Sequence, residues 1–116
     1  MSNTKRERKM NEMKILRLKS ALLIAKYEAD RYSEIEDGGT SNFDTPVLKL
    51  PSEWTQQSLD AAFMNTGLGY SRIAKETFEI FGAVEGQGYR RTAMAKAFRD
   101  AMENLGYVAY VHYIID

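Results

Sequence analysis

The residues from Gly86 to Asp116 read GQGYRRTAMAKAFRDAMENLGYVAYVHYIID, and they decide the predicted fold of this chain. Between Met94 and Leu105 apolar residues recur every three or four positions, which is typical of a helix with one buried face. Gly106 follows at a position where helices commonly end. Residues 107–115 are mostly β-branched or aromatic and predict a strand. Because this strand is apolar on both faces, we expect it inside a sheet or under helices.

Residues 44–50 predict the partner of that strand. Pro46 and Pro51 bracket its apolar centre, and proline has no N–H to donate to a neighbouring strand, so an edge position is expected. No third strand is evident, and two strands alone are marginally stable. The sequence therefore predicts an α+β fold, mostly helical, with about four helices and a small antiparallel sheet near 44–50 and 107–115. Helices or a second chain would complete this sheet.

The other helices follow from the same periodicity. Residues 10–36 are helical in pattern, with a heptad seam at Ile15, Leu18, Leu22, Ala25, Ala29 and Tyr32. This seam is too short to indicate a coiled coil, so we expect the helix to lie across the domain, with self-association through its exposed end as the alternative. Ser52 and Ser71 are candidate N-caps of two further helices, over residues 52–65 and 71–81.

Length and composition indicate one globular domain. The chain has 116 residues, of which 44% are hydrophobic and 28% charged, and it contains no cysteine. Disulfides and thiolate metal sites are therefore excluded, and a reducing, cytoplasmic location is expected. No stretch is long and apolar enough to predict a membrane span. We expect residues 1–9 to form a basic arm and residues 10–116 to form a single α+β domain.

Charge is distributed unevenly although the net charge is zero. Residues 1–19 contain seven Lys and Arg against two acids, and residues 20–60 contain three against eight. A cationic head on a neutral protein favours an anionic partner, although a solvated helix face is the simpler alternative. The candidate phosphate-binding residues of this head are Lys5, Arg6, Arg8, Lys9, Lys14 and Arg17.

A second group of candidates comes from two matches to the pattern Gly-Tyr-x-Arg-x-Ala, which begin at Gly69 and Gly88. Both are expected at helix starts, where cations oppose the helix dipole and a bound anion would explain them. The tyrosines of the two matches could stack on bases. The candidates are Tyr70, Arg72, Tyr89, Arg90 and Arg91. The structural alternative is that these arginines pair with nearby glutamates and the tyrosines pack on the domain.

These observations favour a non-enzymatic small binding protein that engages nucleic acid or a nucleoprotein complex. The alternative is a protein-binding inhibitor or adaptor of the mobile-element type, such as an anti-defence or anti-CRISPR-like protein. Its acidic segment 28–44 would mimic nucleic acid, with Glu34, Glu36 and Asp37 as the contact residues. An edge strand or the first helix would supply the apolar contact, and a homodimer is a further possibility.

Metal and catalytic sites are not predicted. The acidic segment lacks the spaced ligands and fixed glycine of a calcium loop, and we expect no cofactor. His112 is the only histidine and is expected to be partly buried in a strand, without a recognisable catalytic partner. A winged helix-turn-helix with residues 71–81 as its recognition helix is a minor alternative, weakened by the mixed charge of that segment.

Overall fold

The computed structural model describes residues 4–36, 38–39 and 42–114, and for residues 4–11 it describes the backbone only. The helices are α1 (Thr4–Asp30), α2 (Gln56–Phe63) and α3 (Gly88–Asn104). The strands are β1 (Thr45–Lys49), β2 (Gly69–Ala74), β3 (Thr77–Phe81) and β4 (Val108–His112). The described residues thus form three helices and four strands, and the predicted α+β class is confirmed.

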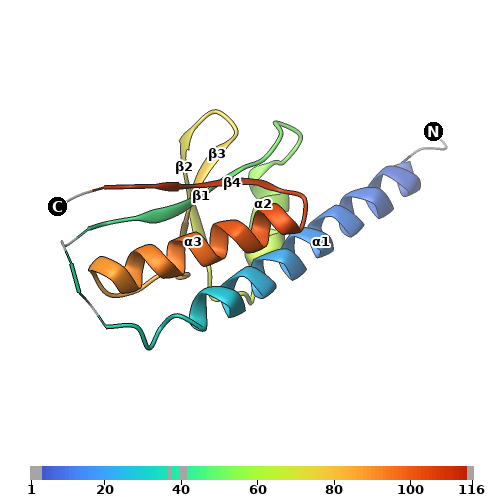
Figure 1. The fold of residues 1–116 in the computed structure, drawn as a ribbon. Coiled ribbons are helices and arrows are strands. Elements are labelled where there is room, and N and C mark those ends of the chain that lie inside the picture. The colour runs from blue at the N-terminus through green and yellow to red at the C-terminus, as the bar shows by residue number, and fades with distance from the viewer. Residues whose placement is uncertain (1–3, 37, 40–41, 115–116) are drawn as a thin grey trace.

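The four strands form one antiparallel sheet in the order β2-β3-β1-β4, with α3 packed against β1 and β4 and α1 lying beside α3 (Figure 1). The core lies between this sheet and the helices. Leu48, Phe78 and Ala109 from three neighbouring strands pack there with Leu22 and Phe98 from the helices. The predicted antiparallel pairing of the segments near 44–50 and 107–115 is confirmed, with Leu48 opposite Ala109.

The predicted helix over residues 71–81 is wrong, because this segment forms the β2–β3 hairpin. Thr77, Phe78 and Ile80 are buried in β3, where β-branched and aromatic side chains suit a pleated surface. Glu76 adopts a left-handed conformation at the turn, with a φ of 55°. The segment's apolar residues fit both a helical and a strand period, and only pairing with β1 resolves the choice. The helix-turn-helix alternative is excluded, since it needed a helix here.

The predicted strand positions are also wrong. β1 lies inside the sheet and β4 lies at its edge. Pro46 is tolerated in an interior strand because the β1–β3 pairing begins one residue later, at Val47 opposite Glu79. β4 alternates buried and exposed residues, with Val108 and Tyr110 on the open face of the sheet. The apolar composition of β4 therefore did not require that both of its faces be buried.

The ends of the helices differ modestly from expectation. α1 ends at Asp30 rather than near residue 36, and turns follow it. α2 begins after Thr55 rather than Ser52, because Thr55 and Ser58 form a reciprocal capping box. The seam predicted for the first helix is buried at Leu18 and Leu22, so α1 lies across the domain as expected.

Candidate functional site

The start of α3 is locked to the loop that precedes β1. Gly88 has a φ of 56°, and a Cβ placed on it would lie 1.7 Å from the carbonyl oxygen of Gly38. The amide of Tyr89 donates to the same oxygen at 2.8 Å. Only glycine fits this approach, so Gly88 fixes where the loop crosses the helix start.

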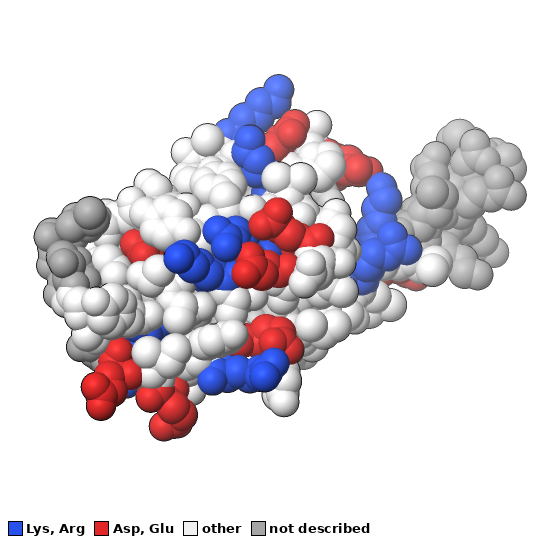
Figure 2. All heavy atoms as spheres, viewed as in Figure 1, with Lys and Arg blue, Asp and Glu red and all other residues white. Residues whose placement is uncertain are grey.

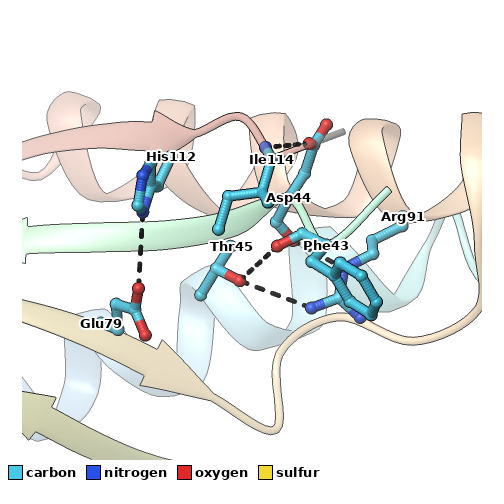
Figure 3. A network of polar contacts seen from close by, with 7 residues as sticks. All are labelled: Phe43, Asp44, Thr45, Glu79, Arg91, His112 and Ile114. Atoms are coloured by element: carbon cyan, nitrogen blue, oxygen red, sulfur yellow. Dashed lines mark hydrogen bonds and ion pairs between the residues drawn. The ribbon is translucent and has the colours of Figure 1, made fainter. Parts of the chain in front are cut away.

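The two arginines of this first turn donate to backbone carbonyls of the same loop. Arg90 Nε donates to the carbonyl of Ile35 at 2.7 Å. Arg91 Nε donates to the carbonyl of Asp44 at 2.8 Å, and its Nη2 donates to Thr45 Oγ1 at 3.4 Å (Figure 3). These contacts explain cations at a helix start without an external anion, because carbonyl oxygens supply the negative partial charge.

Asp44 joins the same network. It is 4% exposed, and its Oδ2 accepts from Thr92 Oγ1 at 2.8 Å. Its Oδ1 accepts from the amide of Ile114 at 3.1 Å (Figure 3). Asp44 thus ties α3 to the end of β4 and cannot serve as a surface acid.

Glu34 and Glu36 are exposed, and Asp37 lies outside the described residues. The acidic-surface hypothesis stays a prediction.

The first Gly-Tyr-x-Arg-x-Ala match lies in a strand and the second in a helix, so the two do not form equivalent sites. The ring of Tyr70 packs on Phe63 and Phe78, with centroid distances of 4.8 and 5.8 Å. Its hydroxyl donates to Asp60 Oδ1 at 2.5 Å, and burial together with this carboxylate raises the pKa of Tyr70 to about 12. Tyr70 is therefore a packing residue that joins the hairpin to α2.

The other residues of these matches lie on separate elements. Arg72 is exposed on the edge strand β2, and its Nε lies 3.5 Å from the carbonyl of Ala74. The ring of Tyr89 is exposed and lies against Gly38 and Gly39. Hence Arg72 and the pair at the start of α3 are not assembled into one binding element.

The basic head divides into two parts. Lys5, Arg6, Arg8 and Lys9 belong to the helical backbone of α1, and their side chains lie outside the described part of the structure. The side chains of Lys14 and Arg17 line a groove of about 460 Å³ between α1, the segment after β1 and the turn between α3 and β4. Figure 2 shows Lys and Arg atoms gathered where α1 leaves the body of the domain, whereas both signs are mixed elsewhere on this face.

The groove combines positive charge with an apolar floor. Its lining residues are Lys14, Arg17, Lys49, Leu50, Pro51, Glu53, Trp54, Leu105, Gly106, Tyr107 and Val108. Three cations thus face one acid, and that acid, Glu53, pairs with Lys14 at 2.7 Å. Within the described residues, Arg17 and Lys49 form no ion pair. The guanidinium of Arg17 and the ammonium of Lys49 are therefore available to an anion.

Two aromatic residues lie among these cations. Trp54 and Tyr107 are half-buried, pack against the core and line the groove. Burial raises the pKa of the Tyr107 hydroxyl, whereas the positive charge of Arg17 acts in the opposite direction. A second cavity of about 480 Å³ lies on the other side of Trp54, but there Lys14 faces both Glu12 and Glu53. The cationic groove is therefore the better candidate for an anion site.

Of the residues that line this groove, Lys14 and Arg17 were named as candidates from the sequence, but Lys49, Trp54 and Tyr107 were not. Tyr107 lies more than 50 residues from Lys49 and Trp54 along the chain, and the three residues follow no motif. The clue in the sequence was weak: Trp54 is the only tryptophan, and it follows a proline-bracketed strand that ends in Leu50. The groove exists because the segment after β1 and the turn between α3 and β4 meet beneath α1, and this is a tertiary arrangement.

The positions of His112 and the acidic residues in the structure decide whether they could act as catalytic or metal-binding groups. His112 is exposed rather than partly buried, and its Nδ1 lies 3.4 Å from Glu79 Oε1 on the open face of the sheet (Figure 3). In the described part of the chain, no three His, Asp or Glu side chains gather around a possible metal position. None of the described helices combines the length and hydrophobicity needed to cross a bilayer.

In comparisons with known proteins, no family model matches this chain, and no curated protein or solved structure is significantly similar to it.

Proposed function

We propose that this protein is a non-enzymatic binding protein that holds a single-stranded segment of nucleic acid in the groove beneath α1. Arg17 and Lys49 contact phosphates, with Lys14 as a weaker contributor because Glu53 already holds its ammonium. Trp54 and Tyr107 offer their rings to bases. The observation that carries the proposal is that one groove holds two half-buried aromatic rings and two cations, Arg17 and Lys49, that form no ion pair with any described residue.

The chemistry of the groove supports this ligand class. Proteins that bind single strands combine a positively charged channel with aromatic rings on which bases stack. Each stacked base contributes about 1–3 kcal/mol, and each phosphate contact releases condensed counterions. A duplex fits less well, because its bases are already stacked and cannot reach rings on the floor of a groove.

The position of the groove also supports the proposal. It opens beside the first half of α1, and four more cations precede it in the sequence of that helix: Lys5, Arg6, Arg8 and Lys9. A strand that leaves the groove along α1 would pass this basic segment. The arginines at the start of α3 contribute to folding instead, since both donate to loop carbonyls.

Trp54 provides a direct readout, because it is the only tryptophan of the chain. Titrating the protein with a short labelled oligothymidylate should quench the Trp54 fluorescence as a base stacks on the indole. The affinity, measured by anisotropy of the label, should fall steeply with salt concentration. Salt-dependent binding without quenching would place the strand elsewhere, and the absence of binding at low salt would contradict the function itself.

A charge-matched pair of variants then locates the site. The double substitution Arg17→Gln, Lys49→Gln should lower the slope of log affinity against log salt by about 1.4, since each contact to a single strand contributes about 0.7. The control is Lys75→Gln, Lys96→Gln, which removes the same charge at two exposed positions outside the groove. Equal losses in both variants would mean that the protein attracts the strand only through its general charge.

A further inference from the structure

The outer side of α1 carries a second apolar stripe. Met13, Leu16, Leu23, Ile24 and Tyr27 are each between 45% and 68% exposed, although they are large and hydrophobic. The side of α1 that faces the core is occupied by a different set, in which Leu18, Leu22, Ala25 and Ala29 are fully buried. With 3.6 residues per turn, the two sets of residues lie on opposite sides of the helix. Both of these sides of α1 are therefore apolar.

The exposed stripe has the spacing of a helix–helix seam. Positions 13, 16, 20, 23 and 27 are separated by three, four, three and four residues, which is the repeat of the inner positions of a coiled coil. Ser20 is the single polar member and lies at the middle of the stripe. Ile24 borders the stripe next to Leu23. Five exposed apolar side chains in one row are more than scattered surface residues require, and such a row marks an interaction surface.

The charges at the two ends of the stripe identify the partner. Before it, Arg6 and Lys9 precede Met13 by seven and four residues and continue the same repeat in the sequence. After it, Asp30 and Glu34 follow at the end of α1 and in the turn beyond it, and both are exposed. A second copy laid alongside in the opposite direction would bring the basic end of one helix to the acidic end of the other. A parallel copy would place like charges together.

We propose that the outer stripe of α1 is a docking surface for a second copy of this chain, in an antiparallel helix pair with a twofold axis near Ser20. Met13 of one chain then lies near the partner's Tyr27, and the two Ser20 side chains meet at the centre. Small residues at the axis allow close approach of the helices. Lys19 of both chains lies near this axis, and this like-charge contact weakens the dimer. This inference is independent of nucleic-acid binding.

Molar mass as a function of concentration tests the dimer. Light scattering on the full chain, without nucleic acid, should show a mass that rises with concentration from 13.2 kDa toward twice that value. The variant Leu16→Glu, Leu23→Glu should stay monomeric over the same range, with a circular dichroism spectrum and melting temperature close to those of the wild type because both side chains are exposed. The control Met64→Glu, at an exposed apolar residue after α2, should dimerise like the wild type.

Engineered cysteines test the orientation, and the absence of native cysteine makes the readout clean. When chains carrying Met13→Cys are mixed with chains carrying Tyr27→Cys under mild oxidation, the mixed disulfide should form in excess over both homodimers. An excess of Met13–Met13 cross-links would show a parallel pair and overturn the proposed arrangement.

Two other results would overturn the proposal entirely. One is a monomer at every concentration. The other is dimerisation that persists in the Leu16→Glu, Leu23→Glu variant, which would place the contact elsewhere. If the monomer instead co-sediments with vesicles of anionic lipid, and this variant does not, the stripe is assigned to a lipid surface and the second copy is rejected.

Discussion

Two regions of this protein are rich in cationic side chains, but the side chains have different surroundings in each. At the start of α3, Arg90 and Arg91 donate to carbonyl oxygens of the loop before β1 at 2.7 and 2.8 Å. In the groove beneath α1, Arg17 and Lys49 line an open surface without an ion pair among the described residues. The sequence pattern favours the first region as the anion site, because cations at a helix start oppose the helix dipole.

The difference shows that the position of a cation in a helix says little about its availability. A guanidinium that fits backbone carbonyls stabilises the fold and has fewer donors left for a ligand. A lysine or arginine on a groove wall is unremarkable in the sequence, yet it is the one that can exchange water for phosphate. Substitutions at the two regions should therefore differ in their effect on stability, with the largest losses around the start of α3.

Replacing Gly88 with alanine should cause the largest loss. The new methyl group would lie 1.7 Å from the Gly38 oxygen, at a φ of 56°, so the loop must move away from α3. We expect a loss of about 3–4 kcal/mol in the free energy of unfolding, measured by urea denaturation. Gly106→Ala is the matched control. Gly106 also has a positive φ but no atom near the added methyl group, so about 1 kcal/mol is expected. Equal losses in the two variants would refute the contact with Gly38.

Arg91→Met should come next. It keeps much of the aliphatic volume and removes the donors to the Asp44 carbonyl and Thr45 Oγ1. The expected loss is about 1–3 kcal/mol by thermal or urea denaturation, because a half-buried carbonyl loses its partner. Lys96→Met, on the exposed side of the same helix, should change stability by less than about 0.5 kcal/mol. If Arg91→Met changes the free energy of unfolding as little as its control does, Arg91 does not stabilise the fold.

Tyr70→Phe should give a smaller, pH-dependent change. Burial and Asp60 raise the pKa of Tyr70 to about 12 in the folded protein, above the ordinary value of 10.0. The stabilisation is therefore complete below pH 10 and is lost as the pH rises toward 12. Urea midpoints at pH 9 and pH 11.5 should fall further for the wild type than for Tyr70→Phe. Tyr27→Phe, on exposed α1, should keep the wild-type dependence. Parallel curves for all three proteins would contradict the Asp60 contact.

Arg17→Gln should have almost no effect on stability, within about 0.5 kcal/mol, because its side chain is exposed and forms no described ion pair. The same melting experiment that detects Arg91→Met provides the comparison. A loss above about 1 kcal/mol would mean that Arg17 supports the fold as Arg91 does, and the groove would lose its free guanidinium.

Sequence patterns predicted the elements with strong local signals. The helix ending before Gly106, the long first helix and the strands near 44–50 and 107–115 were all found, because helical periodicity and β-branched runs are local properties. The segment from Ser71 to Phe81 was assigned to a helix because its apolar spacing fits two periods. Pro46 suggested an edge and the apolar terminal strand suggested an interior, and both were reversed because register with neighbouring strands decides order.

The sequence alone determined the α+β composition, the amphipathic helices, the cationic beginning of the chain and the absence of cysteine chemistry, since each depends on residue type and short spacing. The tertiary structure decided which cations are occupied and which side of α1 is left exposed. It also brought Arg17 and Tyr107, which are far apart in the sequence, to one groove with Lys49 and Trp54. These outcomes depend on which carbonyl, ring or strand lies beside a residue in space, and contacts between distant segments leave no local pattern from which to infer them.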